Sequence, residues 1–235
     1  MIKSALKSVF QALVRRTAPV RFADTTAVEP VSRVFGMDRG QPIDRFYIEA
    51  FLASQAHAIH GRGLEIAEVR YLADSPSIRE RVVLAADRAA IKPHGADAVI
   101  VADLCDAGSL PEAAVDCFVC TQTLNFIYDV PAAVAGACRV LRPGGAFIGT
   151  VSGIAQISRY DADRWGDYWR FTEQSLRKLL QSSFDVVTVQ PFGNMAAAIA
   201  LLQGLAVEDL PSRKILEATD CEYPVILGFK AVKSE

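Results

Sequence analysis

Three acidic residues lie in or just after short apolar runs, where an α/β protein commonly places side chains that bind ligands. Glu65 lies within the first of these runs, Asp87 follows the second and Asp103 follows the third. A carboxylate can accept hydrogen bonds from both hydroxyls of a vicinal diol such as ribose, and Asp87 suits that role. Asp87 is equally typical of a solvated helix cap, whereas Asp103 ends an apolar run and therefore needs a partner.

A second group of side chains with useful chemistry lies at 157–172 (ISRYDADRWGDYWRFT). Aromatic rings pack against flat ligands such as sugars, and charged groups fix hydroxyls or acids. We expect ligand contacts from Arg159, Arg164, Trp165, Tyr168, Trp169 and Arg170. The candidates for a general base are Asp161, Asp167 and Tyr160. The alternative is a lid that packs on its own domain through its two tryptophans.

The composition excludes several classes of protein. A net charge of -2 provides no basic field for nucleic acid, and no apolar run reaches the length of a membrane span. The five cysteines are odd in number and widely spread, which favours a reducing cytoplasm over a small secreted framework. Cys117 and Cys120 lie in an expected strand, where residues three apart point to opposite faces, so no metal or redox site is indicated.

The first 23 residues carry basic side chains and no acid before Asp24. Apolar residues recur among them at helical spacing, which predicts a basic amphipathic helix. Such a helix could make peripheral contact with an anionic membrane through residues 1–16, or serve as an organellar targeting segment. It could also be an ordinary surface helix that docks on its own domain, the interpretation that we favour.

Seven short apolar runs alternate with helical segments in the remainder of the chain. Most runs have apolar residues at consecutive positions, which is typical of strands buried on both faces. The expected strands are 63–67, 81–85, 97–102, 115–121, 145–151, 184–190 and 223–232. The expected helices are 42–60, 130–141, 173–183 and 194–206. This alternation predicts an α/β fold with a mainly parallel sheet that is covered by helices on both faces.

Four segments resemble, in order, the small type-11-like members of the class I S-adenosylmethionine-dependent methyltransferases. They are GLEIAE (63–68), ADAVIVADL (96–104), VDCFVCTQTLNFIYDV (115–130) and CRVLRPGGAFIGTV (138–151). In the last, Arg142 and Pro143 are expected to end a helix, and Gly144 and Gly145 allow the tight turn that follows. The resemblance implies a Rossmann-like seven-stranded sheet with an antiparallel last strand, and S-adenosylmethionine as cofactor.

Three further segments, 35–52, 121–130 and 157–172, resemble a bacterial group of methyltransferases often found with glycosyltransferases. This closer resemblance implies a small-molecule or glycan-linked acceptor and adds contacts from Asp38, Arg39 and Arg45. It also divides the chain into a basic helix and linker at 1–33 and a methyltransferase-like domain at 34–235. Within that domain, 34–62 is a helical segment and 63–235 is the α/β core.

The same resemblance assigns a set of residues to the cofactor. They are Glu65, Ala67, Glu68, Asp87, Asp103, Leu104, Thr121 and Gln122. The sequence departs from the family where glycines should follow the first acid, because Ala67, Val69 and Tyr71 stand in their places. The first two crossovers, 68–80 and 86–96, are also short, so we expect stunted helices or loops there.

Two functions follow from these observations. The first is methyl transfer to a small-molecule or glycan-linked acceptor at oxygen, in a cytoplasmic protein that is membrane-associated if its N-terminal helix binds lipid. The second is a methyltransferase-like binding or scaffold protein that has lost its cofactor, as the missing glycines suggest. A nicotinamide dehydrogenase is disfavoured, because it needs G-x-G-x-x-G after the first strand and this chain does not have it.

Overall fold

The computed structural model describes residues 27–87 and 95–234 of the 235-residue chain. The expected N-terminal amphipathic helix and its membrane contact through residues 1–16 lie outside the described residues. Of the described helices, none is long and apolar enough to cross a membrane.

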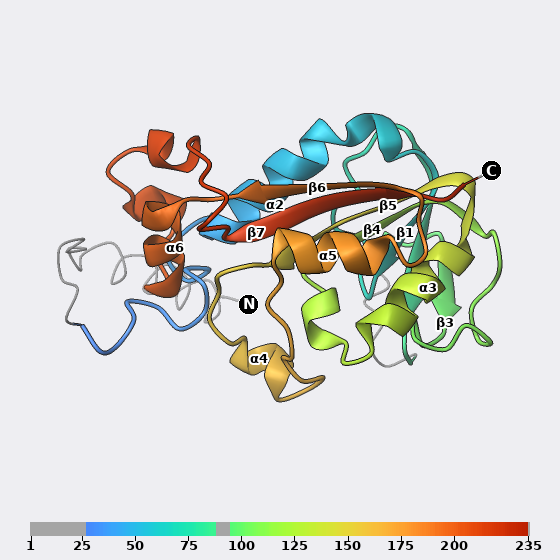
Figure 1. Ribbon diagram of the computed structural model, residues 1–235, viewed down its shortest axis with the longest axis horizontal. Coiled ribbons are helices and arrows are strands. Elements are labelled where there is room, and N and C mark those ends of the chain that lie inside the picture. The colour runs from blue at the N-terminus through green and yellow to red at the C-terminus, as the bar shows by residue number, and fades with distance from the viewer. Residues whose placement is uncertain (1–26, 88–94, 235) are drawn as a thin grey trace, which may run out of the picture.

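A seven-stranded sheet with the order β3-β2-β1-β4-β5-β7-β6 forms the centre of the molecule. Its strands are β1 (Gly61–Ile66), β2 (Ile78–Ala85), β3 (Ala98–Val101), β4 (Val115–Thr121), β5 (Leu141–Ser152), β6 (Val186–Phe192) and β7 (Ile226–Val232). The five neighbouring strands β3, β2, β1, β4 and β5 pair in parallel. Strand β7 runs antiparallel to both β5 and β6 (Figure 1). The predicted fold class is therefore confirmed.

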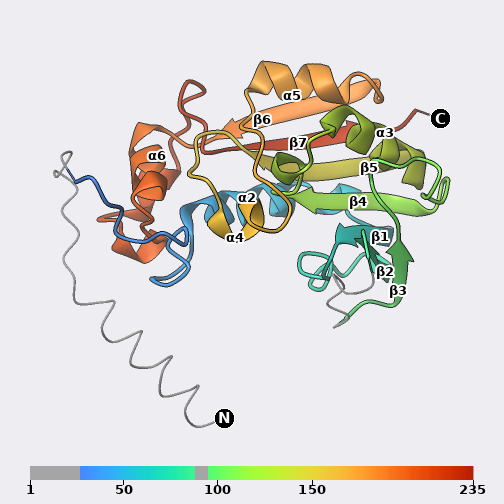
Figure 2. The same cartoon turned by 90° about the horizontal axis from the view of Figure 1, so that it is seen from below.

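Helices cover both faces of this sheet (Figures 1 and 2). They are α2 (Ile43–Ser54), α3 (Val130–Val140), α4 (Arg159–Ala162), α5 (Glu173–Leu180) and α6 (Met195–Leu202). Apolar side chains of α3 and α5 form one core against the strands, and those of α2 and α6 form a second core on the opposite face. Because α4 follows β5 and α6 follows β6, both lie toward the carboxyl edge of the parallel strands.

Local chemistry explains where the helices begin. Asp129 caps α3 by accepting a hydrogen bond from the Ala132 backbone at 3.1 Å, and Pro131 occupies the first turn. At Gly136 a side chain is excluded, because an added Cβ would lie 2.0 Å from the Leu104 carbonyl oxygen. The helix therefore packs directly on the loop that follows β3.

Several expected element boundaries were wrong, and two of them show why. The helix expected at 42–60 ends at Ser54 and is followed by a separate 3-10 turn, η1 (Ala56–Ala58). Strand β5 begins at Leu141 rather than at residue 145, because Leu141 already pairs with Val115 ahead of an irregularity in the β4 register. Gly144, with φ of 75°, bends the chain within the strand instead of before it.

The first crossover, between β1 and β2, contains no helix, as its length predicted. The second includes residues outside the described ranges. Cys117 and Cys120 pack in the two different cores, on opposite faces of β4, which confirms the expected strand geometry. Burial raises the pKa of Cys117 to about 11 and that of Cys120 to about 12, so both thiols stay protonated near neutral pH.

Candidate functional site

A small charged pocket lies where the neighbouring strands β1 and β4 end. Its volume is about 120 Å³. The lining residues are Arg45, Glu65, Ile66, Glu68, Arg70, Tyr71, Val119, Thr121 and Thr123. Ligands of open α/β sheets bind at this carboxyl edge, so the pocket has the expected position. It brings together three of the predicted cofactor residues, Glu65, Glu68 and Thr121, with Arg45 from the predicted acceptor set.

Glu65 uses its carboxylate to hold the loop that follows its own strand. The carboxylate accepts hydrogen bonds from the backbone amides of Arg70 at 2.9 Å, Tyr71 at 3.0 Å and Leu72 at 3.2 Å. Burial raises the pKa of Glu65, and the three amides oppose that rise. The acid predicted to serve the cofactor is thus a structural anchor for residues 67–72.

The loop keeps a tight turn although it lacks glycine. Ala67 adopts a φ of 62°, a left-handed conformation that glycine normally supplies, and its amide donates to the Leu84 carbonyl at 2.9 Å. Tyr71, which stands in place of a family glycine, accepts a hydrogen bond from Arg45 Nη1 at 2.5 Å through its hydroxyl. The side chain that replaces glycine therefore ties the loop to helix α2.

Helix α2 also brings Asp44 to this side of the molecule. Burial raises the pKa of Asp44, while the charges of Arg45 and Arg70 act to lower it. Sequence reasoning did not select Asp44, although its place in the first turn after Pro42 is typical of an acid at a helix start.

The residues predicted for the ribose and adenine do not line the pocket. Asp87 and Asp103 are both exposed, and the Asp103 carboxylate accepts a hydrogen bond from the Cys105 amide at 2.8 Å in a local turn. Asp103 thus has the partner that the sequence argument required, within its own turn, and it is exposed at the end of its strand. Leu104 is buried against α3, so its side chain belongs to the core and offers no surface to an adenine ring.

A polar network connects the ends of β4 and β5. Gln122, at a φ of 50°, accepts hydrogen bonds at its side-chain oxygen from Ser152 Oγ at 2.7 Å and from Asn125 Nδ2 at 3.1 Å. Asn125 also donates to Ser152 Oγ at 2.9 Å. Only Gln122 was predicted. Two features of the sequence could have identified the others. Asn125 is a polar residue within the segment 121–130 that resembles the family, and Ser152 directly follows the expected fifth strand.

The segment after β5 forms a lid that is clamped to the rest of the fold. Asp167, with a side chain 1% exposed, forms an ion pair with Arg170 at 2.5 Å and accepts a hydrogen bond from the Ser158 amide at 2.9 Å. Burial acts to raise the pKa of Asp167, but the hydrogen bonds from Arg170 and Ser158 outweigh it and lower the pKa. Both carboxylate oxygens are engaged, so Asp167 is a poor candidate for a general base.

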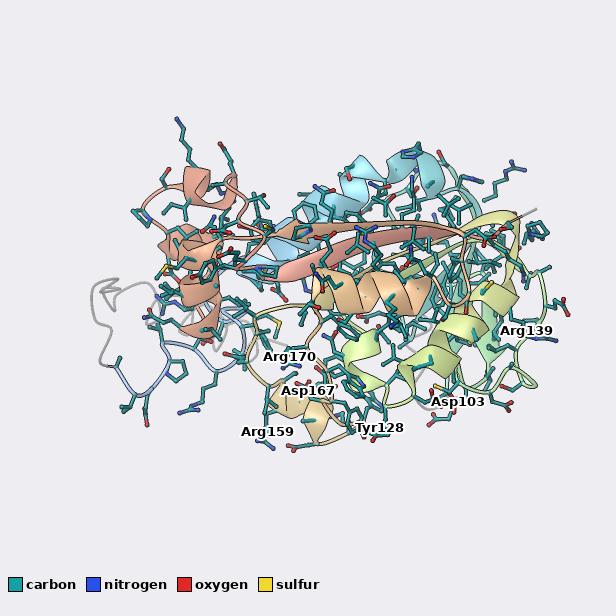
Figure 3. All side chains as sticks on the ribbon, viewed as in Figure 1. Asp103, Tyr128, Arg139, Arg159, Asp167 and Arg170 are labelled. Atoms are coloured by element: carbon teal, nitrogen blue, oxygen red, sulfur yellow. The ribbon has the colours of Figure 1, made fainter. Side chains whose placement is uncertain are left out.

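Arg170 completes this clamp. Its guanidinium donates to the carbonyls of Ala155 at 3.2 Å and Gln156 at 2.6 Å. The backbone of the lid is tied separately, because the amides of Tyr168 and Trp169 both donate to the Asn125 carbonyl, at 3.0 and 3.2 Å. Figure 3 shows Asp167 and Arg170 side by side, Arg159 on helix α4 of the same lid, and Asp103 apart from them.

Aromatic rings are exposed on the lid and on the adjoining loop after β4. Tyr128 lies 5.3 Å from Tyr168 and 5.9 Å from Trp169 between ring centroids, and Trp169 donates to the Ile127 carbonyl at 3.0 Å. The exposed fractions are 71% for Tyr128, 48% for Tyr168 and 39% for Trp169. These three rings, here called the aromatic face, are open to a flat ligand. The sequence-based set lacked Tyr128.

The other lid residues form local pairs. Arg164 stacks 3.6 Å from the Tyr160 ring centroid, and Trp165 meets the same ring edge-on at 6.4 Å. Arg159 pairs with Asp163 at 3.2 Å in an exposed ion pair. Asp161 accepts a hydrogen bond from Ser158 Oγ at 2.5 Å. Tyr160 and Asp161 thus remain candidates for the base, with no further contact that assigns the role.

Two of the predicted acceptor contacts are engaged within the fold. Arg39 donates to both oxygens of Asp209 at 2.6 and 2.8 Å, and the two side chains are only 7% and 16% exposed. Asp38 accepts a hydrogen bond from Ser32 Oγ at 2.5 Å. The Nε and Nη2 groups of Arg39 are thus engaged by Asp209, and a contact between Arg39 and an acceptor stays a prediction.

Comparison with known proteins gives one family match and a shared fold. A family model described as a methyltransferase domain matches residues 67–149. The comparison with curated protein sequences gives no match.

Solved structures with the same fold include a SAM-dependent methyltransferase from Thermotoga maritima, with a TM-score of 0.52 and 17% identity over 82% of this chain and 91% of that one. A SAM-dependent methyltransferase from Archaeoglobus fulgidus gives 0.52 and 13% over 79% and 92%. A Haemonchus contortus phosphoethanolamine N-methyltransferase 2 in complex with S-adenosyl-L-methionine gives 0.54 and 14% over 97% and 57%. The methyltransferase-domain match lies within this shared fold, and at 13 to 17% identity the solved structures show a likeness of fold.

Proposed function

We propose that the chain is an S-adenosylmethionine-dependent methyltransferase that methylates a small-molecule or glycan-linked acceptor at oxygen. The observation that carries this proposal is a pocket with charges of both signs at the ends of β1 and β4, beside a lid with an aromatic face. S-adenosylmethionine supplies an electrophilic methyl group, and the protein's task is to hold it in line with the acceptor.

The lining of the charged pocket fits the amino-acid end of that cofactor. This end carries a carboxylate and an ammonium group, and the pocket presents Arg45 and Arg70 together with Glu68. Asp87 follows β2 and would serve the ribose, and Asp103 follows β3 near the adenine position. At about 120 Å³ the pocket is below the 300 Å³ or so of sites that enclose a whole molecule of this size, which agrees with its assignment to the amino-acid end alone.

The aromatic face supports an acceptor with a flat or ring-shaped surface. Tyr128, Tyr168 and Trp169 offer exposed rings, and sugars pack on such faces. In this proposal Asp167 and Arg170 position the lid, while Asp161 or Tyr160 takes the proton of an acceptor hydroxyl. The Gln122–Asn125–Ser152 network holds the loop that carries Tyr128.

Isothermal titration of the full chain with S-adenosylmethionine, and separately with S-adenosylhomocysteine, tests the first step. We expect saturable binding that weakens about tenfold in Arg45→Ala, because one charged partner of the ligand is lost. Arg213→Ala, a change of the same type in the distant η5 turn (Arg213–Leu216), should bind as the natural protein does. Absence of heat at millimolar ligand from cooperatively folded protein would refute the proposal.

A second function is favoured by the engagement of Glu65. Its carboxylate is saturated by the loop amides, and Arg45 and Tyr71 close the loop against α2. A chain that keeps this arrangement would be a binding protein on a methyltransferase fold. Cofactor binding by the variant Tyr71→Gly separates the two functions. If the variant binds S-adenosylmethionine and the natural protein does not, the natural loop is closed and the binding-protein function is favoured. If the variant and the natural protein both bind it, methyl transfer is favoured.

A further inference from the structure

A larger hollow lies on the same edge of the molecule, away from the charged pocket. Its volume is about 650 Å³. Three segments supply its walls: residues 27–33, the start of the lid, and helix α6. The residues that line it are Ala27, Val28, Glu29, Pro30, Arg33, Gln156, Ile157, Arg159, Ile199, Leu202 and Gln203. We call it the α6 groove. Its size lies within the range of sites that bind organic molecules.

The walls of the α6 groove are joined by hydrogen bonds. The amides of Val31 and Ser32 donate to the Gln203 carbonyl at 2.8 and 3.1 Å, which fixes residues 27–33 to the end of α6. The Gln156 side chain donates to the Arg33 carbonyl at 3.1 Å, which fixes the lid to the same segment. At Gly204, with φ of 69°, an added Cβ would lie 2.0 Å from the Ser32 carbonyl oxygen. Specific hydrogen bonds and close backbone packing therefore hold the walls of the groove together.

Apolar side chains line the groove and remain open to water. The exposed fractions are 97% for Val28, 60% for Ile157, 45% for Leu202 and 39% for Ile199. Clustered apolar side chains that are exposed on a folded protein mark a binding surface more often than scattered ones do. The groove therefore suits a hydrophobic group.

Positive charge accompanies this apolar lining. Arg33 and Arg159 line the groove together with one acid, Glu29. Arg159 pairs with Asp163, but the two side chains are 78% and 59% exposed, so the pair is weak and an acidic ligand can compete for the guanidinium. The occupant that matches both features has an apolar chain and an acidic head.

The charge also argues against the preceding part of the chain as the occupant. Residues 1–26 carry five basic side chains and a single acid, Asp24. A segment of that composition would be repelled by Arg33 and Arg159.

We propose that the α6 groove binds the hydrocarbon chain of an acidic lipid, with the head group at Arg33 and Arg159. The apolar wall formed by Ile157, Ile199 and Leu202 holds the chain. This site goes beyond the proposed methyl transfer and does not depend on it, because none of its residues lines the charged pocket. Since Arg159 begins α4, the bound head group lies at the start of the lid.

Titration of the full chain with dodecyl phosphate below its micelle concentration, without S-adenosylmethionine, tests this site. We expect saturable binding that weakens about tenfold or more in Leu202→Glu and in Arg33→Glu. The matched controls are Val186→Glu, on the exposed side of β6, and Arg213→Glu; both should bind as the natural protein does. Circular dichroism establishes that each variant is folded.

Four results would overturn the proposal. Equal binding of dodecanol would show that the acidic head is not recognised, and binding that survives both groove variants would place the lipid elsewhere. Adsorption to anionic vesicles without binding of monomeric dodecyl phosphate would point to a membrane surface contact instead. A dimer that Leu202→Glu dissociates would identify a second copy of this chain as the occupant. Failure of cofactor binding leaves the expected result unchanged.

Discussion

Replacing Asp209 by alanine should destabilise the protein strongly, because it leaves Arg39 buried without its counter-charge. The change removes hydrogen bonds from Arg39 Nε at 2.6 Å, from Arg39 Nη2 at 2.8 Å and from the Ala206 amide at 2.9 Å. Breaking a buried ion pair in this way costs about 3 to 5 kcal/mol, and the 16% exposure of the Asp209 side chain favours the lower end. For a chain of this size, a loss of about 3 kcal/mol corresponds to a Tm lower by about 6 to 12 °C.

The pH dependence of stability gives an independent reading of the same pair. Burial acts to raise the pKa of Asp209, but the hydrogen bonds from Arg39 and Ala206 and the Arg39 charge outweigh it, so the folded-state pKa is lowered. A lowered carboxyl pKa contributes stability above its ordinary value of 3.8, and that contribution is lost as the pH falls through the folded-state pKa. The destabilisation by Asp209→Ala should therefore shrink in acid.

Urea unfolding followed by circular dichroism measures both effects. The double variant Arg39→Met with Asp209→Leu is the informative control, because apolar side chains can replace a buried ion pair with little loss. We expect the double variant to recover most of the stability that Asp209→Ala loses. A loss below about 1 kcal/mol, as for a surface ion pair, would refute the assignment of this pair as buried and stabilising. The assignment would also be refuted if the double variant were no more stable than Asp209→Ala.

Three further predictions concern the lid, the thiols and the cofactor loop. Asp167→Asn should speed limited proteolysis of the lid, and because the pKa of Asp167 is lowered, the natural lid should also become more sensitive as the pH falls through that value. Equal cleavage of variant and natural protein would contradict the clamp. Under native conditions a thiol reagent should modify the exposed Cys221 first and Cys117 only on unfolding; Cys221→Ser should abolish the fast reaction. Ala67→Gly should raise the free energy of unfolding by about 1 kcal/mol, because glycine adopts the left-handed φ of this position without strain. Denaturant titration measures this change. A lower free energy of unfolding would contradict the prediction and show that packing of the alanine methyl group stabilises the loop.

The strands were predictable because burial on both faces leaves a mark in the local sequence. VDCFVCT at 115–121 is strand β4 with the predicted bounds, and its two cysteines point to the two cores as a period of two requires. The beginning of β5 was not predictable in this way. Its first residue pairs with Val115 across an irregular register, which depends on the neighbouring strand and not on the L-R-P-G-G letters.

The site was predictable in position but less so in detail. Residues at the strand ends follow from the order of the strands, and Glu65, Glu68 and Thr121 do line one pocket. The partner that each side chain selects is a property of the folded chain. Arg39 finds Asp209, which is 170 residues away, and Glu65 finds the amides of its own loop. Neither pairing is visible in the spacing of the sequence, so the prediction for Arg39 did not include its bond to Asp209.

The place of β7 between β5 and β6 has a consequence for synthesis on the ribosome. β5 pairs with β7 on one side, and β6 makes its only contact within the sheet with β7 among the described strands. Until residues 226–232 have left the exit tunnel, β5 carries an open edge and β6 has no partner. Open strand edges favour pairing with other chains. The nascent protein therefore cannot complete its sheet before residue 232 has emerged, and termination before residue 226 should yield aggregation-prone fragments.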